Sequence, residues 1–180
     1  MNYIVLDLEA TCWMGKPPKG INEVIEIGAV KINGYGEVKD YFSKLIKPSV
    51  NPRLSGFCKK LTGIKQEHLN TADDFVRVIE QFQDFIELDY KDYVLFSWGN
   101  NDKPYLMSNC KLHDIDTDWL SPFVDMREKY IRFNGNRKKS GLKHIVESEG
   151  FEFEGDQHSA YVDAYNLSKI FIKYLDEWNI

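Results

Sequence analysis

The sequence lacks the marks of a membrane, secreted or zinc-finger protein. No apolar run approaches the length of a membrane-spanning helix, and a strand predicted from about Tyr3 leaves no room for a signal peptide. The three cysteines are odd in number and widely spaced, without a CxxC pair, which argues against a disulfide framework and a zinc knuckle. We therefore expect a cytoplasmic protein with reduced thiols and no membrane partner.

The sequence also lacks an excess of positive charge and several common enzyme motifs. Its 23 Lys and Arg residues against 28 Asp and Glu residues give a net charge of -5, so composition alone provides no attraction to nucleic acid. It contains no P-loop, HExxH or GxSxG motif, and no internal repeat, low-complexity tract or linker. With 43% hydrophobic residues, residues 1–180 are expected to form a single domain with a sizeable core.

The pattern of apolar residues and turn signals indicates an α/β fold. Strands are predicted at residues 3–8, 24–32, 38–46 and 93–97, with the second and third paired as an antiparallel hairpin. Helices are predicted over residues 75–86 after a capping box at Thr71–Asp74, over 103–110 and 142–148, and along an apolar stripe from Ala164 through Trp178 to the C-terminus. Strands followed by alternating strands and helices predict an α/β sandwich with a mixed sheet.

The first predicted strand carries two acidic residues, Asp7 and Glu9, in an otherwise apolar run. Because side chains alternate along a strand, both carboxylates should point the same way, a few ångströms apart. Neighbouring carboxylates on a buried strand repel one another unless they are protonated, paired with cations or bound to a metal. Taken alone, the pair is as compatible with a structural salt bridge as with a metal site.

Three further residues favour the metal interpretation. Asp102 follows the strand at residues 93–97, near a strand-to-helix turn, although an aspartate there is also a common helix cap. His158 and Asp163 stand at the entrance to the last helix. If both were helical, five residues would rotate them about 140° apart, so we expect His158 in the loop before the helix. From there its imidazole could lean over Asp163; a capping or surface histidine is the alternative.

These residues together resemble the DEDDh group of DnaQ-like 3'-5' exonucleases, which have a ribonuclease H-like fold. The resemblance extends from Ile4 to Ile172 and implies a mixed five-stranded sheet flanked by helices. It rests on the following matches: Asp7-Leu-Glu9, Glu23–Val30 as the second strand, Asp102 after a strand, Gly141–Ile145 and Phe153–Gly155 before the histidine, and His158-x-x-x-x-Asp163.

The segment from Phe57 to Ile64 resembles the corresponding loop of the Eri-type branch of this group, which includes the histone-mRNA 3' exonucleases. That branch mostly acts on RNA. The sequence differs from some of these relatives in having Asn101, and not an aromatic residue, before Asp102.

The resemblance implies a metal-dependent 3'-5' exonuclease that releases nucleoside 5'-monophosphates from single-stranded RNA or DNA 3' ends and short oligonucleotides, with RNA favoured. In the implied two-metal-ion mechanism, two divalent cations, Mg²⁺ or Mn²⁺, are bound by Asp7, Glu9, Asp102 and Asp163. His158 is the expected general base and Glu9 is also catalytic. Two such ions would bring the net charge of -5 to about -1, with the positive charge concentrated where a phosphate docks.

An exonuclease also needs residues that hold the terminal nucleoside. The resemblance points to residues just after the first motif and in the 57–64 loop, so Thr11, Trp13 and Leu61 are candidates, with Asn101 as a fourth. A basic stretch could track the upstream backbone or be an ordinary solvated loop; it contains Arg132, Arg137, Lys138 and Lys139.

Two other interpretations compete with the exonuclease. The first is a non-catalytic module that keeps the fold and binds a nucleic-acid end or a protein in its groove. The second is an unrelated α/β domain in which the acidic residues are structural. The presence of all four acidic residues together with the histidine favours the enzyme.

Overall fold

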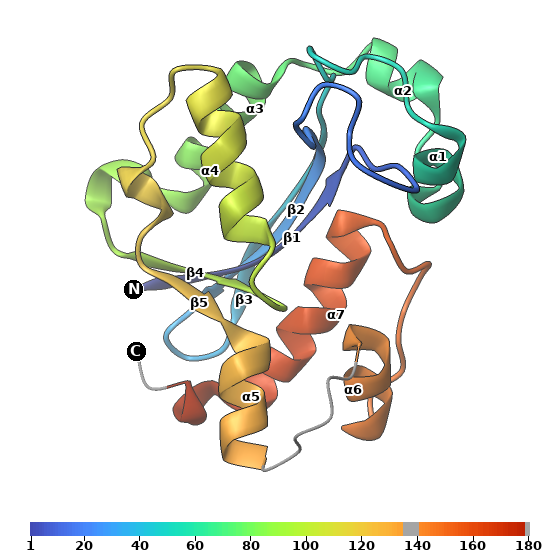
Figure 1. Ribbon diagram of the computed structural model, residues 1–180. Helices are drawn as coiled ribbons and strands as arrows, with labels where there is room; N and C mark the ends of the chain where they lie inside the picture. The colour runs from blue at the N-terminus through green and yellow to red at the C-terminus, as the bar shows by residue number, and fades with distance from the viewer. Residues whose placement is uncertain (135–140, 179–180) are drawn as a thin grey trace.

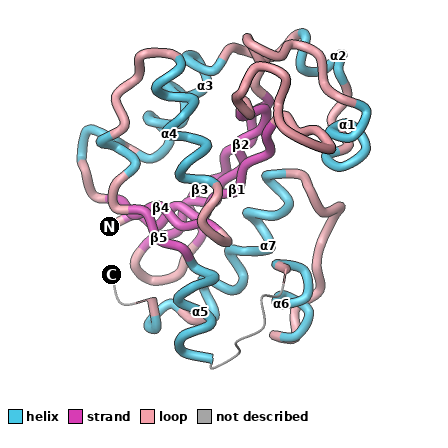
Figure 2. The backbone as a smooth tube through the Cα atoms, viewed as in Figure 1, coloured by secondary structure: helices cyan, strands magenta, loops and turns pink. Residues whose placement is uncertain are grey.

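A mixed five-stranded sheet forms the centre of the computed structural model, which describes residues 1–134 and 141–178 (Figures 1 and 2). The strand order is β3-β2-β1-β4-β5. β2 is antiparallel to both β1 and β3, whereas β4 runs parallel to β1 and β5 runs parallel to β4. Their bounds are β1 Asn2–Ala10, β2 Val24–Asn33, β3 Val38–Leu45, β4 Tyr93–Ser97 and β5 Phe123–Asp125. The predicted mixed sheet is therefore confirmed.

Helices cover both faces of this sheet (Figure 1). Three 3-10 turns, η1 Leu88–Tyr90, η2 Asp118–Leu120 and η3 Leu175–Glu177, accompany the α-helices. No described helix is long and apolar enough to cross a membrane. The α-helices are α1 Gly56–Thr62, α2 Gln66–Asn70, α3 Phe75–Ile86, α4 Asp102–Leu112, α5 Met126–Asn134, α6 Leu142–Ser148 and α7 Ala160–Lys173.

The alternation of side chains along β1 divides the apolar core into two layers. Ile4 and Leu6 pack with residues of α3 and α4 on one face of the sheet. Val5 packs with residues of α5, α6 and α7 on the other. All three side chains are fully buried, so β1 is held firmly between the layers. The strand is therefore a rigid support for the polar residues at its carboxyl end.

Two of the predicted helix ends are wrong. Asp74, and not Thr71, caps α3, because the Asp74 carboxylate directly precedes the helix and accepts the N–H of Arg77 at 2.9 Å. Thr71 instead lies at the end of α2. The last helix ends at Lys173 and does not reach the C-terminus, because the chain turns so that Trp178 is buried and its indole N–H donates to the Phe171 carbonyl.

The segment that was expected to be a loop at residues 57–64 is largely the helix α1. Ser55 caps it by accepting the N–H of Cys58, and Gly63 ends it in the left-handed conformation. The helices α2 and α5 and the strand β5 were not predicted from sequence patterns. The last of these has only three residues, which is too short for an alternating pattern to be visible. All three cysteines are free thiols, as expected.

Candidate active site

Asp7 and Glu9 lie on the face of the sheet that α7 covers. They continue the row of Val5, which packs against α7 residues, because alternate side chains of a strand share a face. In the antiparallel pairing with β2, Asp7 stands opposite Gly28 and Glu9 stands opposite Glu26. The predicted common face of the two carboxylates is thereby confirmed.

Gly28 allows the first turn of α7 to lie directly on the sheet. A Cβ atom at this position would lie 2.2 Å from the backbone carbon of Ala160 and from the backbone nitrogen of Tyr161, far inside van der Waals contact. Only glycine leaves room for this approach. Because Asp163 belongs to the same first turn, its carboxylate comes close enough to Asp7 to raise the pKa of that residue.

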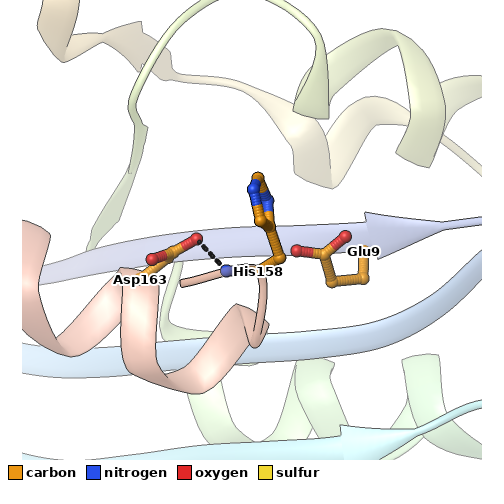
Figure 3. Close-up of side chains that lie close together, drawn as sticks. All are labelled: Glu9, His158 and Asp163. Carbon is orange, nitrogen blue, oxygen red and sulfur yellow. Dashed lines mark hydrogen bonds between the residues drawn. The ribbon is translucent and has the colours of Figure 1, made fainter. Parts of the chain in front are cut away.

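His158 precedes α7 in a loop, as the spacing to Asp163 predicted. Its backbone has a φ of +68°, the left-handed conformation that non-glycine residues rarely adopt. Its N–H donates to Oδ2 of Asp163 at 3.1 Å, and its exposed imidazole stands between the carboxylates of Glu9 and Asp163 in Figure 3. Ligand atoms of Glu9, His158 and Asp163 all lie within 4.8 Å of one another.

Asp102 comes from a third element, the start of α4. It is buried, and it is the first residue of the helix. Asp102 is therefore not the N-cap residue, which was the alternative interpretation. The cap position is Asn101, whose side chain makes no capping hydrogen bond. Burial raises the pKa of Asp102 to about 6, and the nearby Ser97 hydroxyl opposes part of this rise. Its charge in turn raises the pKa of Asp7, which places it at the same cluster.

Burial raises the pKa of every acidic residue in the cluster, and repulsion from neighbouring carboxylates adds to this at Asp7 and Glu9. The pKa of Asp7 lies well above its usual range because of burial first and then the charges of Asp102, Asp163, Glu9 and Glu26. Burial, followed by the charge of Glu26, raises the pKa of Glu9 to about 8. Burial also raises the pKa of Asp163, although the N–H of His158 lowers it in part. Such a cluster binds protons or cations more readily than separate carboxylates do.

This set of donors fits divalent cations. Oδ1 of Asp163 is buried and has no hydrogen-bond partner among residues 1–134 and 141–178. Buried polar atoms normally have a partner, so an unpaired oxygen beside other carboxylates indicates a position for a cation. Carboxylate oxygens are the hard donors that Mg²⁺ and Mn²⁺ prefer. Asp7, Glu9, Asp102 and Asp163 are therefore the residues that would hold such ions.

The four residues predicted to contact substrate differ in their exposure. Leu61 is 38% exposed on α1, Trp13 is half-buried, and Asn101 is exposed just before α4. Thr11 is fully buried, and its hydroxyl oxygen accepts the N–H of Glu23 at 2.8 Å. The contact of each with substrate stays a prediction.

Two further residues were not identified from the sequence. Glu26 is buried opposite Glu9, and only the register of β1 on β2, which the sequence does not reveal, brings them together. Phe57 is 42% exposed on α1, four residues before Leu61, so the two share one helix face. An exposed aromatic at this spacing was the available signal. A cavity of about 640 Å³ beside the cluster is lined in part by Glu26, Leu61 and Gln157.

The basic stretch at residues 132–139 lies mostly outside the described residues, which exclude Arg137, Lys138 and Lys139. Arg132 is described at the end of α5, where its guanidinium forms an exposed ion pair with Glu128 one helical turn earlier. The predicted role of the stretch in tracking a nucleic-acid backbone stays a prediction.

Comparison with known sequences identifies the family. Residues 4–171 match the family model described as exonuclease. The human 3'-5' exoribonuclease 1 is 31% identical over 98% of this chain, and the chain spans 53% of that protein's length. The probable 3'-5' exonuclease KapD of Bacillus subtilis is 31% identical over 94% of the chain and 82% of its own length. The chain thus spans about half the length of the human relative.

Solved structures agree with the fold and with the group. The nuclease domain of 3'hExo, a DEDDh family member bound to rAMP, has a TM-score of 0.88 at 28% identity. The match covers 98% of this chain and 92% of that domain. A 3'-exonuclease solved for its recognition of the histone mRNA stem-loop has a TM-score of 0.89, also at 28% identity, over 98% of this chain and 82% of its own. The predicted ribonuclease H-like fold is confirmed, and the chain belongs to the exonuclease family, in its DEDDh group with the Eri-type exoribonucleases.

Proposed function

We propose that the chain is a metal-dependent 3'-5' exonuclease that acts as a single domain, residues 1–180, in the cytoplasm. It removes nucleoside 5'-monophosphates from the 3' ends of single strands and short oligonucleotides. The observation that carries this proposal is the convergence of Asp7, Glu9, Asp102 and Asp163, from three separate elements, into one cluster whose pKa values are all raised. A fold maintains such repulsion where a cation is to bind.

Two divalent cations, Mg²⁺ or Mn²⁺, are the proposed cofactors. When bound, they would supply charge to the phosphate under attack and to the departing 3' oxygen, and would make water easier to deprotonate. Asp7 and Glu9 hold their positions on β1, which is buried on both faces. Asp102 and Asp163 each belong to the first turn of a helix that packs on the sheet. Rigid elements therefore set the spacing of all four donors.

His158 is the proposed general base, which takes a proton from the water that attacks phosphorus. Its imidazole is exposed, so water can reach it, and it lies beside Glu9 and Asp163. An imidazole nitrogen can accept a proton from water and release it afterwards, which suits this role. His158 has a left-handed backbone conformation in the loop before α7, and its side chain lies beside the carboxylates of Glu9 and Asp163 (Figure 3).

The proposed substrate is single-stranded nucleic acid, with RNA favoured over DNA. The human relative is named an exoribonuclease, and the similar nuclease domain was solved with rAMP. The exposed face of α1, with Leu61 and the added candidate Phe57, offers an apolar surface for a terminal base. Trp13, Thr11 and Asn101 remain the other proposed contacts. Stacking on such a surface is tolerant of base sequence.

The test is stepwise shortening of 5'-labelled single strands of RNA and DNA of matched sequence, with Mg²⁺ or Mn²⁺. We expect a ladder of products that shortens from the 3' end, faster on RNA, and nucleoside 5'-monophosphate as the released product. Asp7→Ala and His158→Ala should abolish or greatly slow it. Two matched controls, Asp84→Ala on α3 and His68→Ala on α2, alter exposed residues and should retain the activity of the parent.

Two results would contradict the proposal. One is the absence of shortening by the folded parent with either cation; tight RNA binding under those conditions would identify a non-catalytic module. The other is equal activity of the parent, Asp7→Ala and His158→Ala, which would assign the activity to a contaminant.

A further inference from the structure

The loop that carries His158 has a backbone conformation that requires support. Residues 149–159 connect α6 to α7, and three of them have positive φ angles, +86° at Gly150, +83° at Gly155 and +68° at His158. A glycine adopts this conformation freely, whereas a histidine does so only where surrounding contacts hold it. Two buried polar side chains, one on each side of His158, provide such contacts.

Glu26 of β2 holds the chain just after His158. Its Oε2 accepts the backbone N–H of Ala160 at 3.0 Å, and its Oε1 accepts the hydroxyl of Ser159 at 3.3 Å. The side chain is only 7% exposed. Ser159 occupies the N-cap position of α7, but its own side chain caps no N–H. Glu26, from a distant part of the chain, therefore caps the N-terminus of α7 in place of Ser159. It also attaches the start of α7 to the sheet.

Asn166 of α7 holds the chain before His158. Its Oδ1 accepts the N–H of Glu154 at 3.0 Å, and its Nδ2 donates to the carbonyl of Glu154 at 2.8 Å. The same Nδ2 donates to the Val162 carbonyl at 2.9 Å, and the residue is fully buried. The amide thus pairs both backbone groups of one loop residue, as a neighbouring strand would, and it is the side chain best placed to set the path of the loop.

We propose that Glu26 and Asn166 are positioning residues that hold His158 over Glu9 and Asp163 from the two ends of its loop. The inference rests on the proposed role of His158 as the general base. Glu26 and Asn166 make their hydrogen bonds to backbone and hydroxyl groups of the loop and of α7, and Oδ1 of Asn166 also accepts the Lys169 ammonium at 3.1 Å. Asn166 is therefore expected to affect the reaction through the placement of the histidine, and Glu26 to do so in addition to the effect of its charge beside Glu9.

A double-mutant cycle with His158→Ala tests this dependence. In the parent background at saturating Mg²⁺, Asn166→Ala and Glu26→Ala should each lower kcat by about 10²-fold, the effect of a displacement of about 1 Å, and change KM little. In the His158→Ala background, measured with excess enzyme, the same changes should lower the remaining rate by less than about threefold, since the residue they position is gone. Equal losses in both backgrounds would overturn the proposal.

Milder substitutions separate positioning from a general loss of folding. Glu26→Gln keeps an acceptor for Ala160 and should restore kcat to near the parent value. Asn166→Asp keeps the acceptor for the Glu154 N–H but loses the donor, so its kcat should fall between those of the parent and Asn166→Ala. The matched control is Glu152→Gln, an exposed side chain on the same loop, which should match the parent. Failure of Glu26→Gln to exceed Glu26→Ala would contradict the role given to Glu26.

Hydrogen exchange of a peptide that covers residues 151–163 supplies a measurement that does not depend on activity. Glu26→Ala should speed exchange of the Ala160 amide, and Asn166→Ala that of the Glu154 amide, because each loses its acceptor. Unchanged exchange at these amides would contradict the proposal that Glu26 and Asn166 hold the loop. If the parent is inactive but shows the expected exchange pattern, the proposed function is contradicted, whereas the support of the loop by Glu26 and Asn166 is not.

Discussion

Acidic side chains at the carboxyl end of β1 and just before β2 have opposite surroundings. Glu23, just before β2, is 2% exposed and accepts the N–H groups of Ser49, Val50 and Asn51 at 2.6 to 2.7 Å. Asp7 and Glu9 are surrounded by other carboxylates, and every cause that shifts their pKa values raises them.

This comparison distinguishes an acidic residue with a structural role, Glu23, from the acidic residues of the candidate site, Asp7 and Glu9. Glu23 carries a charge that three peptide groups stabilise, so it fastens the segment at residues 49–51 to the start of β2. Asp7 and Glu9 destabilise the fold while they are charged, because burial and repulsion both favour their neutral forms. Burial of a carboxylate alone does not distinguish these roles, whereas the identity of its neighbours does.

The largest expected effect is that of Asp7→Asn on catalysis. The amide keeps the shape of the side chain but removes a charge from the cluster, so exonuclease activity should fall by at least about 10²-fold. In the absence of metal the same variant should be more stable than the parent by about 0.5–2 kcal/mol, because one source of repulsion is gone. Activity assays and thermal melts in EDTA measure the two effects. A variant that loses stability, or that retains activity, would place Asp7 with the structural acids.

Gly28→Ala should reduce both activity and stability. The new methyl group would meet the backbone of Ala160 and Tyr161, so the first turn of α7 must move away from β2. Asp163 moves with it, and a displacement of about 1 Å should lower kcat about 10²-fold. Gly34→Ala, at the β2–β3 turn with no atom close to its Cβ position, is the matched control. Equal activity of the two variants would show that the contact of α7 with Gly28 does not set the site.

Glu23→Gln should act on stability alone. The neutral amide offers one oxygen in place of two charged ones to the three N–H groups, which should cost roughly 2–3 kcal/mol of the free energy of unfolding. Well below the melting temperature, kcat should stay within about threefold of the parent, because the side chain is not part of the acidic cluster. Urea unfolding and steady-state kinetics measure the two quantities. A loss of kcat without a loss of stability would reverse the assignment of Glu23.

Metal-free stability should also depend on pH. The pKa of Glu9 rises from 4.5 in the unfolded chain to about 8 in the fold, so between these values the folded chain holds a proton that the unfolded chain has released. Stability from this group is therefore complete below about pH 4.5 and is lost as pH rises toward about 8. In thermal melts with EDTA, the stability of Glu9→Gln relative to that of the parent should increase as pH increases. A difference that stays constant with pH would contradict the raised pKa.

Much of the fold could be predicted from local patterns. The strand Tyr93–Ser97 and the helix Leu142–Ser148 have the expected bounds, because apolar runs and turn signals mark both of their ends. The three-residue strand β5 and the helix α1 could not be found in this way. Strand β5 is too short to show a period, and α1 depends on a serine cap and on burial against loops distant in sequence.

The candidate site was predictable one element at a time. The period of two placed Asp7 and Glu9 on one face, and the turn of the helix placed His158 in the loop before Asp163. The partners of these residues depend on tertiary structure. Glu26 meets Glu9 only through the register of two strands, and Asp163 reaches the cluster only because Gly28 admits the helix. Resemblance to a family, and not local pattern, brought the acidic residues together.

The central claim is that the repelling carboxylates form a site for divalent cations. The most direct test is the melting temperature of the metal-free parent and of Asp7→Asn at pH 8 as Mn²⁺ is added, with Asp84→Asn as the matched control. Mn²⁺ at about 100 times its dissociation constant should stabilise the parent and Asp84→Asn by about 2.7 kcal/mol, and Asp7→Asn far less. Equal stabilisation of all three proteins, or of none, would contradict the claim.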